Sequence, residues 1–432
     1  MRMYDIIYKK RLGEALSRAE IEFAVNGFVF GSIPDYQMSA LAMAICFNGM
    51  TDEETFYLTD AMMRSGDMVN LEQFGGLCVD KHSTGGVGDK TTLIIAPIVA
   101  SLGARVAKMS GRGLGFTGGT VDKLESLNGY RSSLTGDEFL SQVERVGIAV
   151  TGQSGNLVPA DKKLYALRDV TATVDSIPLI ASSIMSKKLA SGADSIVLDV
   201  KCGSGAFMKT EDSAISLATA MISIGNAFGR KVRALITDMG VPLGRFVGNS
   251  LEVFEAIQVL NGRGEEKLTE LCISLAANMV AMALGLDDDT ARVRVVNAIS
   301  SGAALSKMRE WIYAQGGDVS LIDAPERLLG AKFKYEYKAK RGGYLAAINA
   351  EAVGVASMLL GAGRAKKDDD IDPLAGIELR VDFGQEVCEN DTLAILYASD
   401  ESLFENAKEM LDSAFDFSQQ MPHKRTLIKK IL

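Results

Sequence analysis

The sequence has few of the residues from which several common kinds of site are built. It contains only two histidines, His82 and His423, so a histidine-rich metal site is excluded. The five cysteines are scattered and form no Cys-x-x-Cys pair, which excludes a disulfide framework or a zinc site of that type. We expect reduced, buried thiols at all five positions: Cys46, Cys78, Cys202, Cys272 and Cys388.

Long apolar runs and an excess of positive charge are also missing. No run of about 18 apolar residues occurs, and residues 1–14 lack the apolar core of a signal peptide. We therefore expect a soluble, cytoplasmic protein with no membrane partner. Acidic residues outnumber basic ones by 55 to 46, giving a net charge of −9, so no nucleic-acid partner is expected. A small anionic ligand would need a local positive pocket.

Glycine, in contrast, is abundant, with 43 residues, and part of it is concentrated in two turns. The turns are KHSTGGVGD at 81–89 and SGRGLGFTGGT at 110–120. Each follows a strand-like run, at 77–80 and 104–109, and each leads into a helix-like run. Glycine lets several main-chain N–H groups converge on a ligand, and a helix start adds the positive end of its dipole. With their lysines and hydroxyl groups, the turns predict a cradle for an oxyanion, with phosphate as the expected ligand.

Three other interpretations of these turns compete. A Walker A loop is excluded, because Asp89 separates Gly88 from Lys90. The dinucleotide-binding pattern Gly-x-Gly-x-x-Gly is present at 113–118, but no clear acidic residue follows at the usual distance. The third interpretation is a pair of tight strand-to-helix turns with no ligand. The cations and hydroxyl groups in both turns argue against it.

Helical and strand-like patterns alternate in blocks, which predicts an α/β fold with more than one lobe. Residues 1–65 and 160–194 show helical spacing, including a capping box in which Ser17 lies three residues before Glu20. Strand-like runs at 195–200 and 231–238 continue the α/β pattern. We expect three parts: a small all-helical lobe (1–65 and 160–194), a large α/β lobe with a mixed central sheet (70–155 and 195–330), and a C-terminal α+β domain (331–432).

Three segments resemble the pyrimidine nucleoside phosphorylases, the family that includes thymidine phosphorylase. They are the first turn at 81–89, the second turn continued to 110–125, and the segment 154–194. The resemblance continues over essentially the full length. In one departure, Phe116 stands where the family motif has histidine. The resemblance implies a homodimer formed through the helical lobe.

Two expected helices, 160–174 and 177–193, carry candidate base-binding residues. Tyr165 and Arg168 share one helix face, and Ser183 and Lys187 share another. A guanidinium, an ammonium and a hydroxyl directed at one spot suit a planar, oxygen-rich ligand that becomes anionic, as a departing pyrimidine does. Alternatively, Arg168 pairs with a nearby aspartate on the surface and the lysines at 187–188 form a solvated face. The resemblance assigns the base to Arg168, Ser183 and Lys187, with Tyr165 as a further contact.

For phosphate, the resemblance implies a set of cationic and hydroxyl side chains: Lys81, Ser83, Thr92, Lys108, Ser110 and Thr120. In the resembled family a lysine at position 108 accompanies use of both uridine and thymidine, and its ammonium can donate to a ribose 2′-hydroxyl. His82 opens the first turn, and we expect it to donate a proton or a hydrogen bond to a base carbonyl. A purely structural histidine is the alternative. The expected catalytic residues are His82, Arg168 and Lys187.

The resemblance also implies a structural monovalent cation, K⁺. Its ligands would be main-chain oxygens of four residues and one carboxylate: Gly88, Lys90, Leu243, Phe246 and Glu255. Oxygen ligands with a single carboxylate suit a weakly charged, hard ion. The side chains at positions 90 and 246 are expected to matter little. Alternatively, Glu255 is an exposed helix residue.

The expected activity is the reversible phosphorolysis of uridine, thymidine and deoxyuridine. Inorganic phosphate would attack directly, with inversion and no organic cofactor, to give the free base and α-D-ribose or 2-deoxyribose 1-phosphate. The alternatives are a deoxy-specific thymidine phosphorylase, a phosphoribosyltransferase of the same two-lobed plan, and a non-catalytic nucleoside-binding relative. The transferase would need magnesium ligands near the cradle, for which Asp89, Asp122 and Glu125 are available.

Overall fold

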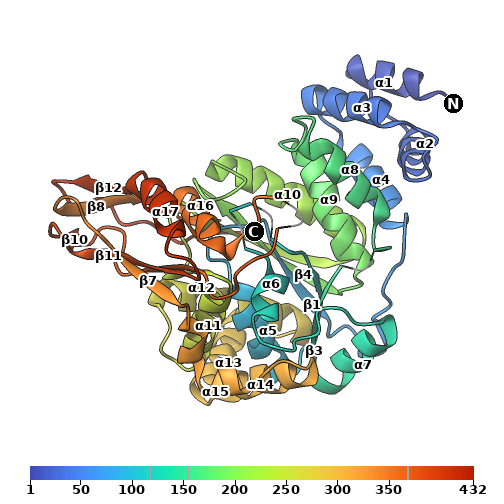
Figure 1. Ribbon diagram of the computed structural model, residues 1–432. Helices are drawn as coiled ribbons and strands as arrows, with labels where there is room; N and C mark the ends of the chain where they lie inside the picture. The colour runs from blue at the N-terminus through green and yellow to red at the C-terminus, as the bar shows by residue number, and fades with distance from the viewer. Residues whose placement is uncertain (114, 117, 154, 367–368) are drawn as a thin grey trace.

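The computed structural model describes residues 1–113, 115–116, 118–153, 155–366 and 369–432. Its chain forms a helical lobe, an α/β lobe and a C-terminal module of strands and helices, which confirms the predicted fold class. Figure 1 shows the blue N-terminal helices beside the green pair α8 and α9, with the α/β lobe in the centre and the red and orange C-terminal module on the opposite side.

The helical lobe combines the N-terminal helices with a pair from the middle of the chain. The capping box at Ser17 and Glu20 is present, and a second one joins Thr51 to Glu54. The helices are α1 (Met3–Arg11), α2 (Arg18–Val29), α3 (Asp35–Asn48), α4 (Asp52–Met63), α8 (Pro159–Asp169) and α9 (Ile177–Ala190). Helix α8 ends five residues before the predicted 174, because the turn that follows folds back onto Arg168.

The central sheet of the α/β lobe is mixed. Strands β1 (Val79–Ser83), β4 (Ser195–Cys202) and β5 (Lys231–Asp238) are parallel, and β13 (Ile428–Ile431) adds to β5 in the antiparallel sense. Strands β2 (Val106–Ser110) and β3 (Ile148–Gly152) form a parallel pair, linked to β1 by a bridge between Cys78 and Arg105. Strand β1 ends three residues and β2 one residue later than predicted, so the first residues of both glycine turns belong to strands.

Further helices of the α/β lobe pack on these strands or on one another. They are α5 (Thr91–Ser101), α6 (Thr120–Glu125), α7 (Gly136–Val146), α10 (Glu211–Ala227), α11 (Asn249–Leu260), α12 (Glu266–Leu284), α13 (Asp288–Ser300), α14 (Ala303–Ala314) and α15 (Ser320–Asp323), with short 3₁₀ turns at Glu72–Phe74 and Pro325–Leu329. By length and composition alone α12 could cross a membrane, but it packs in this lobe against α13, α5 and β4 and is mostly buried.

The C-terminal module contains two antiparallel sheets, with strand orders β6-β9-β11-β7 and β10-β8-β12. Its elements are β7 (Phe333–Lys338), β8 (Gly343–Ile348), α16 (Ala350–Ser357) with a π-helical turn at Met358–Ala362, β9 (Gly376–Leu379), β10 (Glu386–Val387), β11 (Thr392–Ala398), α17 (Leu403–Asp412) and β12 (Phe415–Ser418). The α/β lobe contributes β6 (Phe246–Gly248), and the module returns β13 to the central sheet. The two parts therefore exchange strands.

Candidate active site

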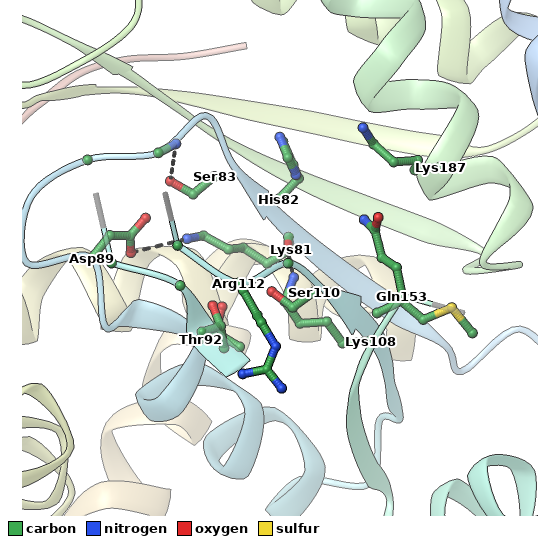
Figure 2. Close-up of a pocket in the computed structure, with 18 of the residues that line it drawn as sticks. Lys81, His82, Ser83, Asp89, Thr92, Lys108, Ser110, Arg112, Gln153 and Lys187 are labelled. Carbon is green, nitrogen blue, oxygen red and sulfur yellow. Dashed lines mark hydrogen bonds and ion pairs between the residues drawn. The ribbon is translucent and has the colours of Figure 1, made fainter. Parts of the chain in front are cut away.

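A cavity of about 240 Å³ lies where β1 and β2 end. The two glycine turns, the first turn of α5 and the last turn of α9 also line it. Figure 2 shows His82 and Lys187 on one side of this cavity and Thr92 on the other, with Lys81 and Ser110 between them. The sequence prediction of two turns meeting at one ligand-sized space is therefore confirmed in its geometry.

All the residues predicted to hold phosphate line this cavity: Lys81, Ser83, Thr92, Lys108, Ser110 and Thr120. Strands β1 and β2 end in serines, and the two threonines lie in the first turns of α5 and α6. The Ser83 hydroxyl accepts a hydrogen bond from Gly85 N–H at 3.3 Å, which folds the first turn back over the strand end. The structure thus collects a lysine and a serine from each of β1 and β2 and a threonine from each of α5 and α6 around the space.

Buried charges beneath the cavity are nearly, but not fully, compensated. The Lys81 ammonium lies 3.3 Å from Asp199 and 3.6 Å from Asp89, and it donates to Thr91 Oγ1 at 2.6 Å. Lys201 donates to Asp199 at 2.7 Å. The lysines of the whole cluster are Lys81, Lys108, Lys188 and Lys201, and its aspartates are Asp80, Asp89 and Asp199. One positive charge is therefore in excess, which favours an anion.

Asp80 organises the lysines on the side of β2 and α9. Its carboxylate lies 3.2 Å from Lys108 Nζ and 2.6 Å from Lys188 Nζ. Burial opposes ionisation, but these two ammonium groups lower the pKa of Asp80 to about 2. Burial lowers the pKa of Lys108 to about 8; Asp80 opposes this shift, and Lys188 and Lys81 add to it. Lys108 also donates to the main-chain oxygen of Lys81.

The surroundings of His82 favour its neutral form. Burial, together with the ammonium groups of Lys188, Lys108 and Lys187, lowers its pKa well below the usual 6.5. A neutral imidazole can donate one hydrogen bond, but it carries no positive charge at neutral pH. Of the two roles expected for His82, hydrogen-bond donation therefore fits this environment better than transfer of a proton from an imidazolium.

A second hollow of about 290 Å³ adjoins the first. The residues predicted to contact the base, namely Tyr165, Arg168, Ser183 and Lys187, all line it. The two hollows share His82, Ser83, Gly85 and Lys187. Apolar side chains, among them Ile180, Ile184 and Phe207, complete the second hollow. A polar cavity and a partly apolar hollow thus meet at His82.

Among the residues that the structure describes, Arg168 forms no ion pair with an aspartate. Its guanidinium is buried and donates to main-chain oxygens of Thr173 at 3.0 Å, Val174 at 2.8 Å and Leu179 at 3.2 Å. Burial lowers its pKa from the usual value. The alternative that the lysines at 187–188 form a solvated face holds only in part. Lys187 donates to the Asp161 carboxylate and to Ser183 Oγ at 3.3 Å. Lys188 is buried beneath the cavity.

The residues predicted to bind K⁺ come together, but the centre of the group is not free for an ion. Lys90 is fully buried, and its own ammonium donates to the main-chain oxygens of Leu243 at 2.9 Å and Phe246 at 2.7 Å. It also donates to the carboxylate of Glu255, which is buried and not exposed. The expectation that the side chain at position 90 matters little is therefore wrong.

The second glycine turn is tied to its surroundings by its acidic neighbours. Asp122 accepts from Gly113 N–H at 2.6 Å and from Arg364 at 3.0 Å, and Glu125 pairs with Arg112. Leu114 and Thr117 of this turn lie outside the described residues. Phe116 packs against Gly354 of α16, joining the turn to the C-terminal module. The carboxylates considered as magnesium ligands are thus already engaged by cations or main-chain groups.

Several lining residues escaped sequence reasoning. The sequence predicts Lys188 only on a solvated face and does not predict Arg112 or Gln153 as site residues. Asp80, which pairs with Lys188 beneath the cavity, is not predicted either. The doublet at 187–188 was the available signal for Lys188, since adjacent helix residues point in directions about 100° apart. No local signal marks Gln153.

Three family descriptions match successive parts of the chain. They are the helical bundle domain of a glycosyl transferase family at residues 4–66, its a/b domain at 75–305, and the pyrimidine nucleoside phosphorylase C-terminal domain at 344–418. The pyrimidine-nucleoside phosphorylase of Staphylococcus haemolyticus is 54% identical, and that of Staphylococcus aureus strain MSSA476 is 53% identical; both alignments cover the whole of each chain.

The chain belongs to the pyrimidine-nucleoside phosphorylase family. It is accordingly an enzyme of the glycosyltransferase class. Among solved structures, anthranilate phosphoribosyltransferase from Thermus thermophilus superimposes with a TM-score of 0.56 at 17% identity, over 72% of this phosphorylase-family chain and 98% of the other. That likeness concerns the fold alone.

Proposed function

We propose that the enzyme catalyses the reversible phosphorolysis of uridine, thymidine and deoxyuridine to the free base and the α-pentose 1-phosphate. The adjoining hollows are the observation that carries this proposal. One is lined by lysines, hydroxyls and glycine turns, the other by Arg168, Ser183 and apolar side chains, and they share His82 and Lys187. A sugar that spans the shared wall would place its anomeric carbon between phosphate and base.

In this mechanism phosphate binds to Lys81, Ser83, Thr92, Lys108, Ser110 and Thr120. One phosphate oxygen attacks the anomeric carbon on the face opposite the base, and the electrons of the glycosidic bond leave with the base. An ammonium about 4 Å from phosphate contributes roughly 4 kcal/mol at an effective dielectric near 20. That is too little alone for an enzymatic acceleration of about 8 kcal/mol or more, so orientation and stabilisation of the leaving base supply the remainder.

The departing base carries its negative charge on its carbonyl oxygens and ring nitrogen. Arg168 and Lys187 stabilise this charge, Ser183 and Tyr165 position the ring, and neutral His82 donates a hydrogen bond to a carbonyl. Three main-chain carbonyls hold the guanidinium of Arg168 in place before substrate arrives. Donors fixed in advance need no reorganisation when the charge develops.

The test is product analysis with uridine, thymidine and cytidine, each with and without phosphate. We expect base release from uridine and thymidine only when phosphate is present. Base release from thymidine but not from uridine would favour the deoxy-specific alternative. Absence of release from every nucleoside would favour a non-catalytic binding protein.

The second candidate is the phosphoribosyltransferase of the same two-lobed plan, which would use a pyrophosphate–magnesium substrate and would need acidic metal ligands near the cradle. The carboxylates nearest the cradle argue against it, because Asp89 faces Lys81 and Thr91 while Asp122 holds Arg364. Phosphorolysis that persists in excess chelator would exclude it, whereas strict magnesium dependence would favour it.

We also propose a homodimer formed through the helical lobe. Large apolar side chains on and beside α1–α3 are exposed, among them Tyr4, Phe30, Tyr36 and Phe47. Burying such side chains between two copies would remove them from water. Light scattering of the wild type and of a Phe47→Glu variant would test this. We expect the wild type to be a dimer and the variant a monomer. A monomeric wild type would contradict the proposal.

A further inference from the structure

Lys90 places an ammonium group among the oxygens of a predicted cation site. The side chain has no measurable exposure, and its three donors reach three acceptors: the main-chain oxygens of Leu243 and Phe246 and the carboxylate of Glu255. An ammonium has three N–H donors, so this set satisfies it completely. No donor is left over to attract a further ligand.

The carboxylate on the other side is equally well satisfied. Glu255 Oε1 accepts from Arg245 N–H at 2.7 Å, and Oε2 accepts from Phe246 N–H at 3.1 Å as well as from Lys90. Glu255 itself is 3% exposed. A buried carboxylate requires a positive partner, and in this chain the side chain of Lys90 supplies that charge.

The location links this pair to the anion cradle. Lys90 directly precedes α5, whose first two residues are Thr91 and the cavity-lining Thr92. Leu243 and Phe246 lie in the segment between β5 and α11, far away in sequence. The approach is close, since a Cβ on Gly88 would lie 2.5 Å from the Leu243 oxygen. The ammonium therefore holds the first glycine turn against another part of the lobe.

We propose that Lys90 is the resident cation of this site and replaces the K⁺ ion that the family resemblance implies. The charge is the same, and the acceptors of the ammonium are three of the five ligands predicted for the ion, namely Leu243, Phe246 and Glu255. The covalent tether means that no ion has to be bound from solution. In this account Lys90 is a positioning residue for the first glycine turn. The enzyme neither binds a monovalent cation at these oxygens nor depends on one.

The wild type is tested first, by thermal unfolding in KCl, NaCl and tetramethylammonium chloride at constant ionic strength. Tetramethylammonium is too large for a buried cluster and serves as the control cation. We expect the same Tm in all three salts, and a crystal soaked in rubidium chloride should show no rubidium at these oxygens. A saturable rise of Tm with K⁺, or bound rubidium at these oxygens, would overturn the proposal.

The Lys90→Thr variant removes the ammonium and leaves the acceptors in place. In tetramethylammonium chloride we expect its Tm to lie about 5 °C or more below that of the wild type. In KCl we expect the Tm to recover. Rubidium should bind at the vacated oxygens in a soaked crystal. Lys90→Met is the matched control, because its apolar side chain fills the space, so K⁺ should not restore its Tm. A folded Lys90→Thr variant without K⁺ recovery, or an equal recovery in Lys90→Met, would contradict the proposal.

A kinetic readout separates positioning of the turn from general stability. In Lys90→Thr we expect the KM for phosphate to rise several-fold without K⁺ and to return when K⁺ is added, with little change in the KM for nucleoside. This arm rests on the proposed function. The Tm and rubidium measurements do not, so a failure of the cation proposal remains distinguishable from a failure of the assigned reaction.

Discussion

Asp80 Oδ1 lies 3.2 Å from the Nζ of Lys108, in a fully buried position at the base of the anion cavity. Its second oxygen holds Lys188. This one carboxylate therefore holds two lysine side chains in place beneath the cavity. Sequence reasoning did not single it out, yet the properties of Lys108 depend on it.

Replacing Asp80 with Asn should destabilise the protein by about 3 kcal/mol or more, because two buried ammonium groups lose their partner. The pKa of Lys108 should fall further below its present value of about 8. Urea unfolding measures the first effect. Asp382→Asn is the control: it removes a half-exposed pair with Arg245 and should cost less than about 1 kcal/mol. Equal stability of the two variants would contradict the role given to Asp80.

Lys108 should govern the choice between ribose and deoxyribose. A charged hydrogen bond to the 2′-hydroxyl contributes about 1.5–3 kcal/mol, so Lys108→Met should lower kcat/KM for uridine roughly 10-fold or more relative to thymidine. In the wild type the same ratio should fall as pH rises through about 8, where Lys108 loses its proton. Taking the ratio cancels the titration of phosphate. An unchanged ratio in Lys108→Met would show that the lysine does not contact the sugar.

His82 should remain neutral across the physiological range. Its pKa in the folded protein is well below 6.5, the value of the ordinary side chain, so the unfolded chain binds more protons below that pH. Stability should therefore fall as pH drops below about 6.5, by about 1.4 kcal/mol per pH unit from this group. His82→Gln should remove that dependence.

Imidazole NMR signals check the same point directly. Because the chain has two histidines, a His423→Gln variant assigns the signals, and the His82 signal should not titrate near pH 6.5. A normal titration of His82 would contradict the neutral hydrogen-bond donor proposed for it.

Ser183→Ala should lower kcat/KM about 10-fold through loss of a hydroxyl that faces the base hollow and accepts from Lys187. Its neighbour provides the control. Ser182 donates to Thr55 in α4 at 3.3 Å, so Ser182→Ala should leave kinetics unchanged. If both variants had the same kcat/KM, the base would not bind in the hollow that Ser183 lines.

Local patterns predicted most of the elements that build the cavity. Alternating apolar runs ended at glycine turns, and capping boxes such as Ser17 with Glu20 marked helix starts. Side chains three or four apart placed Arg168 and Lys187 on converging faces, and both line the same hollow. These features depend on neighbours in sequence, which is why they could be derived.

Contacts between distant segments could not be derived in this way. Lys90 donates a hydrogen bond to Phe246, which lies 156 positions away, and no local pattern around either residue predicts this contact. The pairing of β13 with β5 likewise carries the chain end back to the central sheet. Asp80 and Lys188 lie 108 positions apart, so the compensation of their charges is a property of the fold.

The most direct test of the central claim follows the oxygen atoms of phosphate. Uridine is incubated with phosphate labelled with ¹⁸O at all its oxygens, and the sugar product is examined by ³¹P NMR and mass spectrometry. Direct attack predicts uracil and α-ribose 1-phosphate that retains every label, including the oxygen bonded to the anomeric carbon. A product with an unlabelled bridging oxygen, a β-anomer, or uracil released without phosphate would contradict the account.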